Sequence, residues 1–570
     1  MTHIVETAES FADAALRGYC AVYERLVRPV PGGVLRSTAT AEGKVAVVIG
    51  GGSGHYPAFA GYVGPGLADA AVAGDVFASP ATRLVASVAR KAHRGGGILL
   101  GFGNYAGDVL NFGFAAQQLR ADGLDVRVLA VTDDVASAAA DDTARRRGVA
   151  GDIAVFKIAG AAAEAGADLD AVERLARHAN ARTRSFGVAF GGCTLPGAHE
   201  PLFTVAEGRM AIGLGIHGEP GVKETAILPA SELARLLVDR LVEEAPPGAS
   251  GRAAVLLNGL GGTKYEELFV LWTFVSAALE KAGITAVAPL VGEYVTSLDM
   301  EGCSLSITWL DDELEPLWLA PCDSAALRVG TVPATAPAPA LPPDDENRLS
   351  FPDSTPEGRE AGRIMALALG RLAATLRSAE AELGRIDALA GDGDHGQGMT
   401  RGSQAAADAA AKASEAGAGA AGVLAAAADA WASRAGGTSG VIWGLGLQTA
   451  STALNDRVRP SAAQIRDAAT QALEAVMRLG GARPGDKTLV DAFAPFAETL
   501  AADLEREQPI KVAWAHATER AFDAANATAD LMPKLGRARI HEDRSRGHRD
   551  AGAVSFALAA RTIGDTINEQ

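Results

Sequence analysis

In the first part of the chain, short apolar runs repeatedly end in glycine or acidic residues and give way to helical patterns. The pattern recurs in "KVAVVIGGGSGH" (44–55), "GGGILLGFGNYAGD" (95–108), "DVRVLAVTDD" (125–134) and "RAAVLLNGLGGTKYEE" (252–267). Short apolar runs bounded by turn residues are typical of buried strands. Strands that alternate with helices predict an α/β domain, with its ligand sites at the carboxyl ends of the strands.

Two stretches predict boundaries within the chain. "GVAFGGCTLPG" (187–197) predicts a junction between two α/β subdomains, which together occupy residues 1–328. Residues 329–358 are rich in Pro, Ala and Asp and show almost no periodicity, which is typical of an extended, semi-rigid linker. We therefore expect a second domain at residues 359–570.

After the linker, the apolar positions follow a helical period. One amphipathic seam consists of Met365, Leu369, Leu372, Leu376, Ala379 and Leu383. Ala-rich segments follow around 404–433 and 461–478, and small side chains permit close approach of helices. No strand is expected between 359 and 535, so we predict an all-α second domain.

Composition narrows the function classes. The chain has 570 residues, of which 48% are apolar and 21% charged, as expected for a globular protein of several domains. A net charge of -17 argues against a nucleic acid or an anionic membrane as partner. The four cysteines form no C-x-x-C pair, so we expect buried, reduced thiols. No secretory signal or membrane-span run is evident, and we expect a cytoplasmic protein.

Three carboxylates crowd one turn in the helical half. "RIDALAGDGDHGQG" (385–398) places Asp387, Asp392 and Asp394 close together, with glycines between them. Such acids repel one another unless a cation compensates, and Mg²⁺ takes carboxylate and phosphate oxygens. The alternative is a solvated acidic turn or a helix cap.

Two further turns in this half suggest an anion site. In "AGGTSGVIWG" (435–444), glycines, Thr438 and Ser439 open a helix, where backbone N–H groups and hydroxyls can cradle an anion. A plain glycine stop followed by a helix cap is the alternative. "GARPGDKTLVDAF" (481–493) and the arginine-rich "GRARIHEDRSRGHRDAGAV" (536–554) add charge. Together these features predict a magnesium–nucleotide site, although the chain has no P-loop motif near these turns.

Two histidines in the first half lie in glycine-rich turns. His55 ends "GGGSGH", which lacks the P-loop lysine and the G-x-G-x-x-G spacing, and His217 lies in "GIHGEPG" (215–221). A single histidine is usually structural, but a neutral imidazole can also act as a base or add to a carbonyl. Asp108, at a third such turn, could orient a basic histidine.

These motifs resemble a known family. "GGGSGHYPAFAGYVGPG", "AVAGDVFASP", "NYAGDVLNFGFA", "CTLPG" and "GIHGEPG" are similar to the signatures of the substrate domain of dihydroxyacetone kinases. "GDGDHG", "GGTSG", "PGDKTLVDA" and "RSRGHRDAGAVS" are similar to those of the nucleotide domain. The chain thus resembles, over nearly its whole length, the ATP-dependent kinases in which a K-type substrate domain is fused to an L-type nucleotide domain.

The resemblance implies roles for individual residues. His217 would bind the substrate ketone covalently as a hemiaminal, and His55 would take the proton from the attacking hydroxyl, with Asp108 close by. Asp387, Asp392 and Asp394 would bind two Mg²⁺ ions. The substrate-binding residues would be Gly52, Ser53, Gly54 and Gly103. The nucleotide-binding residues would be His395, Gly396, Thr438, Ser439, Arg537, Asp550 and Gly552. The resemblance also implies a helical barrel for the nucleotide domain and a homodimer formed through the substrate domain.

The chain departs from the family pattern at three places. Tyr56 stands where G-H-E-P is common, Gly103 replaces the lysine before Asn104, and "GRARIHEDRS" differs beyond Arg537. Loss of the lysine and a new phenol in the pocket wall favour a C4 ketose such as erythrulose over dihydroxyacetone. Two other functions stay open: cleavage of FAD to a cyclic flavin phosphate at the nucleotide site, and a non-catalytic regulator. A phosphotransfer protein is a less favoured phosphoryl donor than ATP.

Overall fold

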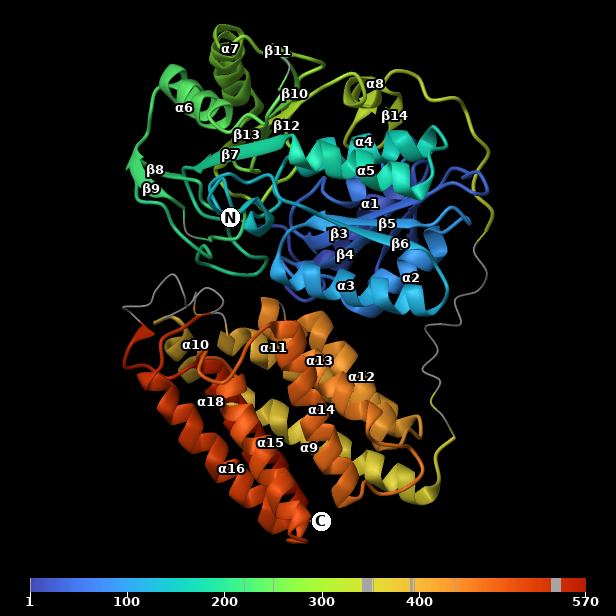
Figure 1. Cartoon of the computed structure of the whole chain (residues 1–570), viewed down its shortest axis with the longest axis vertical. Coiled ribbons are helices and arrows are strands. Elements are labelled where there is room, and N and C mark those ends of the chain that lie inside the picture. The colour runs from blue at the N-terminus through green and yellow to red at the C-terminus, as the bar shows by residue number, and fades with distance from the viewer. Residues whose placement is uncertain are drawn as a thin grey trace. The chain divides into compact units, whose positions relative to one another are not determined.

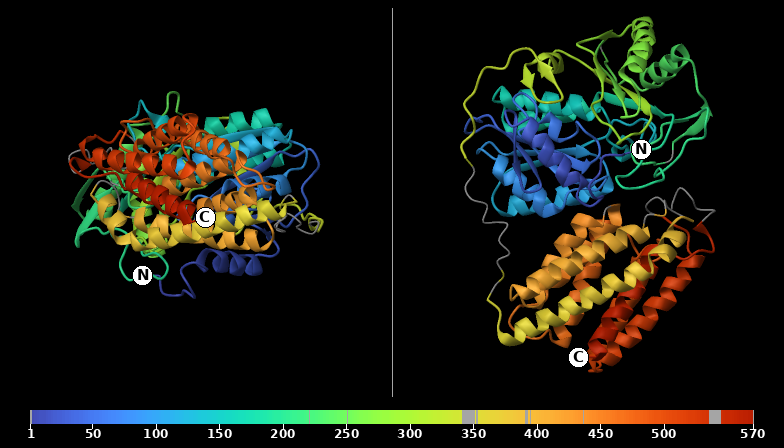
Figure 2. Two further views of the ribbon diagram at one scale, coloured as in Figure 1. Left: turned by 90° about the horizontal axis from the view of Figure 1, so that it is seen from below. Right: turned by 180° about the vertical axis from the view of Figure 1, so that it is seen from behind.

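The computed structural model describes residues 2–219, 221–249, 251–340, 351, 353–389, 393, 395–435, 437–534 and 545–569. Contacts divide the chain into two compact units, Met1–Ala340 and Leu341–Gln570 (Figures 1 and 2). Within the described ranges, every helix is too short or too polar to cross a membrane.

The first sheet of the N-terminal unit has the order β1-β2-β4-β3-β5-β6. Its strands are β1 (Val27–Val30), β2 (Gly33–Arg36), β3 (Ala46–Ser53), β4 (Ala70–Val76), β5 (Ile98–Gly103) and β6 (Val126–Val131). The strands from β4 to β6 run parallel, and β1 and β2 add an antiparallel edge. The helices of this half are α1 (Phe11–Val22), α2 (Thr82–Ala92), α3 (Ala106–Ala121), α4 (Asp152–Glu164) and α5 (Leu169–Ala181). Helices α2 and α3 cover one face of the sheet and α4 and α5 the other (Figure 1).

A second sheet follows, in the order β11-β10-β13-β7-β8-β9, with β12 also paired to β10. Its strands are β7 (Thr183–Ala189), β8 (Arg209–Ile212), β9 (Lys223–Ala226), β10 (Arg252–Gly259), β11 (Thr285–Ala286), β12 (Leu290–Gly292) and β13 (Gly302–Trp309). Helices α6 (Ala230–Val242) and α7 (Tyr265–Lys281) pack on one face. The unit ends with α8 (Leu314–Leu319), β14 (Cys322–Asp323) and β15 (Arg328–Val329).

Both faces of the second sheet are buried, as β10 illustrates. Val255 and Leu257 point into the core beneath α6 and α7, whereas Ala254 and Leu256 join the core shared with the first sheet. Alternate residues of a strand point to opposite faces, so the uninterrupted apolar run of β10 reflects burial on both sides. The predicted junction at 187–197 lies too late in the chain, because the second sheet already begins with β7 at Thr183.

The described part of the C-terminal unit is helical, as predicted. Its helices are α9 (Pro356–Ser378), α10 (Glu380–Asp387), α11 (His395–Glu415), α12 (Ala420–Arg434), α13 (Gly437–Thr452), α14 (Ala462–Gly480), α15 (Val490–Glu505), α16 (Ile510–Ala527) and α18 (Ala551–Glu569). Helices α11 to α16 pack against one another in sequence, α16 packs on α18, and α9 packs on both α18 and α11. These contacts close a ring of helices. Its alanines face inward at helical spacing, as at Ala513, Ala517, Ala521 and Ala525 of α16.

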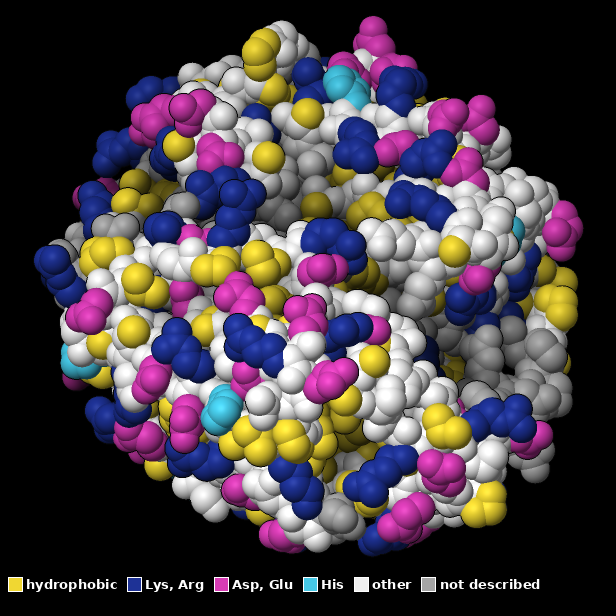
Figure 3. Space-filling view, turned by 60° about the horizontal axis from the view of Figure 1, so that its bottom comes forward, with side chains coloured by type: hydrophobic (Ala, Val, Ile, Leu, Met, Phe, Trp, Pro, Cys, Tyr) yellow, Lys and Arg dark blue, Asp and Glu magenta, His cyan; other side chains and the backbone are white. Residues whose placement is uncertain are grey.

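Two sequence predictions differ in detail from the structure. The apolar seam from Met365 to Leu383 belongs to two helices, because α9 ends at Ser378 and α10 begins at Glu380. The first part of the Pro-rich segment is held on the N-terminal unit, since Ala39 N–H bonds Ala336 and Ala338 N–H bonds Ser37. On the face drawn in Figure 3, acidic and basic side chains are interspersed, with no broad basic patch.

Candidate active site

His55 emerges from the carboxyl end of β3 through a turn that only glycine can form. Gly54 has φ +98°, and a Cβ there would lie 2.8 Å from the Phe77 ring. The buried His55 ring stacks on Phe77 with centroids 4.9 Å apart, and its Nδ1 lies 2.7 Å from the Thr296 carbonyl oxygen. Because a carbonyl only accepts hydrogen bonds, Nδ1 carries the proton and Nε2 is left with its lone pair.

His217 comes from the loop between β8 and β9 and is held by Glu219. The main-chain N–H of His217 donates to Glu219 Oε2 at 2.6 Å, and His217 Nδ1 lies 3.0 Å from Glu219 Oε1. A carboxylate accepts, so this Nδ1 also carries its proton. The free Nε2 of His217 lies 3.0 Å from the Nε2 of His55, and this contact is a hydrogen bond only when one ring holds a second proton.

Aromatic rings surround the His217 imidazole. Its centroid lies 5.0 Å from Phe77, 5.0 Å from Tyr105 and 4.9 Å from His55, each at a steep interplanar angle. The His217 side chain is nevertheless 16% exposed, whereas His55 is buried. Of the two histidines, His217 is therefore the one that a small carbonyl compound can reach.

Asp108, in the first turn of α3, is a buried carboxyl near this pair. Burial raises the pKa of Asp108 to about 7, although Ser79 and His217 oppose the shift. Within the described ranges its Oδ1 has no hydrogen-bond partner. Burial, followed by the charge of His217, lowers the pKa of His55 to about 3. A proton acceptor works best with a pKa near the working pH, which favours Asp108 over His55.

The other predicted substrate residues lie at two neighbouring strand ends. A Cβ at Gly52 would lie 2.8 Å from Ala78 N, and Ser53 Oγ donates to the Gly74 carbonyl at 2.6 Å. At the end of β5, a Cβ at Gly103 would lie 3.4 Å from the Tyr105 ring and 3.2 Å from Gly148 O. Gly103 is therefore next to the ring that contacts His217.

Tyr56 lies elsewhere than the sequence suggested. Its ring packs edge-on against Tyr19 of α1, with centroids 5.8 Å apart, and its hydroxyl bonds Tyr23. The side chain is half exposed. The expectation that this phenol forms a pocket wall beside Gly103 is therefore not supported, because the ring turns towards α1.

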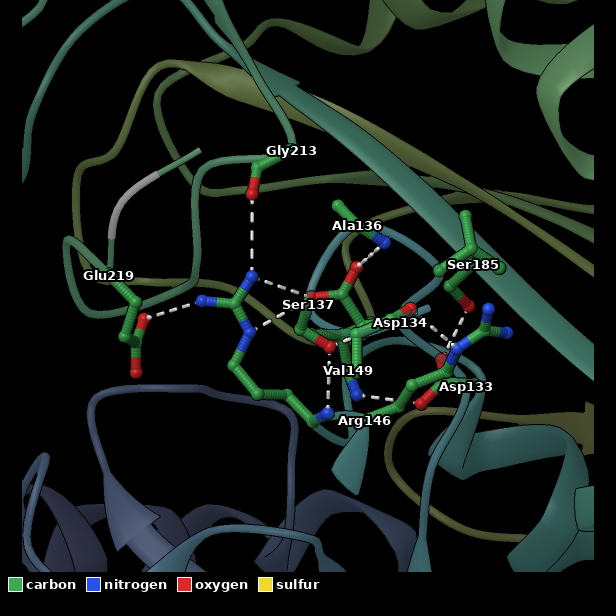
Figure 4. Close-up of polar contacts among 12 residues, drawn as sticks. Asp133, Asp134, Ala136, Ser137, Arg146, Val149, Ser185, Gly213 and Glu219 are labelled. Carbon is green, nitrogen blue, oxygen red and sulfur yellow. Dashed lines mark hydrogen bonds and ion pairs between the residues drawn. The ribbon is translucent and has the colours of Figure 1, made fainter. Parts of the chain in front are cut away.

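Sequence reasoning missed a largely buried charge network behind His217. Arg147 donates to Asp134 Oδ2 at 2.8 and 3.0 Å and lies 3.5 Å from Glu219 Oε2. In Figure 4, dashed lines join Asp134, Gly213 and Glu219 to this guanidinium group. Arg147 belongs to a run of three arginines (145–147), a pattern more typical of a solvated loop. Only the folded structure reveals Glu219 as its partner.

Four of the predicted nucleotide residues, His395, Gly396, Asp550 and Gly552, lie near the starts of α11 and α18. His395 N–H donates to Asp387 at 3.3 Å, and His395 Nε2 lies 3.0 Å from Ser555 Oγ. Asp550 caps α18 by accepting from Ala553 N–H at 2.7 Å. A Cβ at Gly552 would lie 3.2 Å from Leu489, and one at Gly396 would overlap the Glu380 carbonyl. Asp392, Asp394 and Arg537 lie outside the described residues.

Acidic side chains lie close together at this end of the helical ring. Burial first, and then the neighbouring Asp491 and Asp387, raises the pKa of Asp550 to about 7. Carboxylates that repel one another in this way fit a site for Mg²⁺. Thr438 and Ser439 are exposed in the first turn of α13.

Lys487, in the stretch 481–493, bonds to main-chain carbonyls of the helical unit. Its buried ammonium donates to the Leu531 and Ser545 carbonyls at 3.1 and 2.7 Å, and burial lowers its pKa. It therefore ties together the two chain segments on either side of residues 535–544.

Comparisons with known proteins match each of the two units to a family domain. Residues 17–326 match the Dak1 domain and residues 389–565 match the DAK2 domain. The chain belongs to the dihydroxyacetone kinase family. It is 52% identical to the D-erythrulose kinase of Mycolicibacterium smegmatis, over 100% of this chain and 99% of that one. It is 51% identical to the L-erythrulose kinase of Pectobacterium atrosepticum, over 100% and 97%. This places it in the erythrulose branch of the family.

Two more distant relatives of the family bear on the nucleotide site. The crystal structure of the dihydroxyacetone kinase from C. freundii in complex with AMP-PNP and Mg²⁺ superposes with a TM-score of 0.53, at 28% identity over 99% of both chains. The human triokinase/FMN cyclase is 33% identical over 92% of this chain and 91% of its own length.

Proposed function

We propose that the protein is an erythrulose kinase, which transfers the γ-phosphoryl group of ATP to a terminal hydroxyl of the ketose. The observation that carries this proposal is the identity of about half of all residues, over the whole chain, with kinases named for D- and L-erythrulose. The coarser assignment, an ATP-dependent ketose kinase, follows from the fused Dak1 and Dak2 domains together with these relatives.

The geometry around His217 supports a covalent mode of ketose binding. The lone pair of Nε2 adds to the carbonyl carbon, the C=O π bond breaks, and the oxygen takes up a proton to give the hemiaminal hydroxyl. The ring becomes cationic during the addition, and Glu219, 3.0 Å from Nδ1, can stabilise this charge or accept its proton. A polyol without a carbonyl, such as glycerol, cannot react in this way.

Asp108 then serves as the proton acceptor for phosphoryl transfer. Its pKa of about 7 leaves it ionised in a large fraction of molecules near neutral pH. The attacking hydroxyl gives its proton to Asp108 while its oxygen bonds to the γ-phosphorus, and the bond to the ADP oxygen breaks. His55, whose pKa is about 3, stays neutral and offers its Nε2 as a hydrogen-bond acceptor.

The residues of the helical unit fit ATP and Mg²⁺. Asp387, Asp392 and Asp394 would hold the metal, which when bound neutralises phosphate charge. His395, Gly396, Thr438, Ser439, Arg537, Asp550 and Gly552 would line the nucleotide site. Two metal ions and a homodimer stay predictions, and sedimentation of the intact chain tests the second.

The test of the function is an assay of ADP release in Mg²⁺. The acceptors are D-erythrulose, L-erythrulose, dihydroxyacetone, glyceraldehyde and glycerol, compared by kcat/KM. We expect one erythrulose enantiomer to give the highest value and glycerol to give none. A clear preference for dihydroxyacetone would contradict the erythrulose proposal but leave the ketose kinase intact.

A second activity is favoured by one observation, the similarity to a triokinase/FMN cyclase. The nucleotide site would then also cleave FAD into cyclic FMN and AMP. Release of cyclic FMN from FAD in Mn²⁺, without any ketose, tests this activity. A purely regulatory function is disfavoured, because both domains are present and His217 and the metal acids are retained.

A further inference from the structure

Glu219 contacts His217 twice, at its main chain and at its ring. One carboxylate oxygen accepts from the His217 N–H at 2.6 Å, and the other lies 3.0 Å from Nδ1. These two bonds fix both the position of the ring and the nitrogen that carries its proton. The reactive Nε2 can hold a free lone pair only while Glu219 keeps this orientation.

Arg147 holds Glu219 from behind. Its guanidinium lies 3.5 Å from Glu219 Oε2 and 2.8 Å from Asp134 Oδ2, and it donates to the Gly213 carbonyl at 3.3 Å. Its main chain is fixed as well, since its N–H donates to Ser137 Oγ at 2.9 Å and its carbonyl accepts from Asp134 N–H at 3.1 Å. Arg147 is therefore a rigid anchor with few alternative positions.

The backbone of the His217 loop leaves room for the contact between Glu219 and Arg147. A Cβ at Gly215 would overlap both Glu219 Oε2 and Arg147 Nη1. The first glycine of "GIHGEPG" is thus required for the Glu219–Arg147 contact, which explains a glycine whose φ is not left-handed.

We propose that Arg147, acting through Glu219, is a positioning residue that keeps His217 in the Nδ1–H tautomer, with Nε2 free to bond the ketose carbonyl. The expected effect on ketose phosphorylation rests on the proposed function. The expected tautomer of His217 concerns the protein without ketose and does not depend on that function. When ionised, Asp134, Arg147 and Glu219 carry a net charge of minus one, which stabilises the ring cation that forms on addition. Without Arg147, Glu219 loses an anchor and the tautomer is no longer fixed.

The test compares Arg147→Met with Arg146→Met in the full-length protein. Arg146 is the adjacent buried arginine and pairs with Glu244, which also pairs with Arg240 at 2.8 Å and so keeps a partner when Arg146 is replaced. Long-range ¹H–¹⁵N spectra of protein labelled at histidine distinguish a protonated from an unprotonated ring nitrogen, and His217→Ala assigns the His217 signals.

We expect wild type and Arg146→Met to show His217 protonated at Nδ1 and unprotonated at Nε2. In Arg147→Met we expect a mixture of tautomers, and kcat/KM for erythrulose lower by about 10- to 100-fold, as is usual when the partner of an orienting group is lost. KM for ATP stays unchanged. A wild-type tautomer pattern in Arg147→Met, with kcat/KM within about twofold of wild type, overturns the proposal.

A second variant keeps the test decisive if Arg147→Met does not fold. Glu219→Gln preserves the shape and one acceptor but removes the charge, and we expect the same loss of a single tautomer. An unchanged His217 pattern in this variant overturns the proposal. If wild type shows the expected tautomer but phosphorylates no ketose, the function is wrong while the positioning by Arg147 and Glu219 stands.

Discussion

The Nε2 atoms of His55 and His217 lie 3.0 Å apart, although the two histidines follow strands of different sheets. The loop at Thr296–Leu298 contacts both turns. Thr296 N–H donates to the His55 carbonyl, and the Ser297 hydroxyl donates to the carbonyl of Ile216, which precedes His217. A ketose that adds to Nε2 of His217, as proposed, would displace the His55 contact and would lie between residues that follow strands of two different sheets.

Asp108→Asn should lower kcat by about 10²- to 10⁴-fold, because the amide cannot accept the hydroxyl proton. In wild type, kcat/KM should fall as the pH drops below about 7, since Asp108 then becomes protonated. The variant should lose this dependence. Asp152→Asn is the control, because this second carboxyl is also buried and burial likewise raises its pKa. Steady-state pH profiles decide, and equal losses in both variants would contradict the role of Asp108.

Asp387→Asn should abolish phosphorylation in Mg²⁺ and leave ketose binding unchanged, because the acid belongs to the helical unit. Asp392→Asn and Asp394→Asn should behave alike. Asp408→Asn, at an exposed position of α11, serves as the control and should retain full activity. ADP release and calorimetric titration with ketose measure the two effects, and near wild-type turnover in Asp387→Asn would show that this acid holds no metal.

Gly103→Lys should shift the preference from erythrulose towards dihydroxyacetone. The new side chain would start 3.4 Å from the Tyr105 ring and restore an amine that can bond a triose hydroxyl. Gly103→Ala crowds Gly148 in the same way but adds no amine, so it should lower activity without changing the preference. The ratio of kcat/KM for the two ketoses is the readout, and an unchanged ratio in the lysine variant would assign the selectivity to other residues.

Lys487→Met should loosen the segments that its ammonium joins. Two carbonyls, Leu531 O and Ser545 O, lose a charged donor, which costs about 1–3 kcal/mol of local stability. Hydrogen exchange of peptides containing these residues should become faster. Lys511→Met, which removes an exposed bond to Asn568 O, should leave those peptides unchanged. Unaltered exchange in Lys487→Met would mean that the two bonds contribute little.

The sequence predicted those strands whose burial shows as a continuous apolar run. Strands β3, β5, β6 and β10 are apolar runs that end in glycine or acid, and their positions followed from that pattern. The break at Ala379 was not predicted, because the apolar seam continues across it. Helix α10 packs on α11 and α18, and these contacts between distant segments are not visible in the local pattern.

The candidate site was predictable only in part. His55 and His217 stood out by their glycine-rich turns, but their contact joins residues 162 positions apart and no local pattern encodes it. The arginines at 145–147 show the limit best: Arg145 is exposed, Arg146 pairs with Glu244 and Arg147 supports Glu219. A run of like charges says nothing about such different surroundings, which the packing of the two sheets decides.

The central claim is that the ketose is held through its carbonyl carbon on His217, and ¹³C NMR with erythrulose labelled at that carbon tests it directly. With excess wild-type protein, we expect the ketone resonance to be replaced by the resonance of a tetrahedral carbon bonded to nitrogen. With His217→Ala the ketone resonance should persist. A bound ketose that retains its ketone resonance in the wild-type protein would contradict the account.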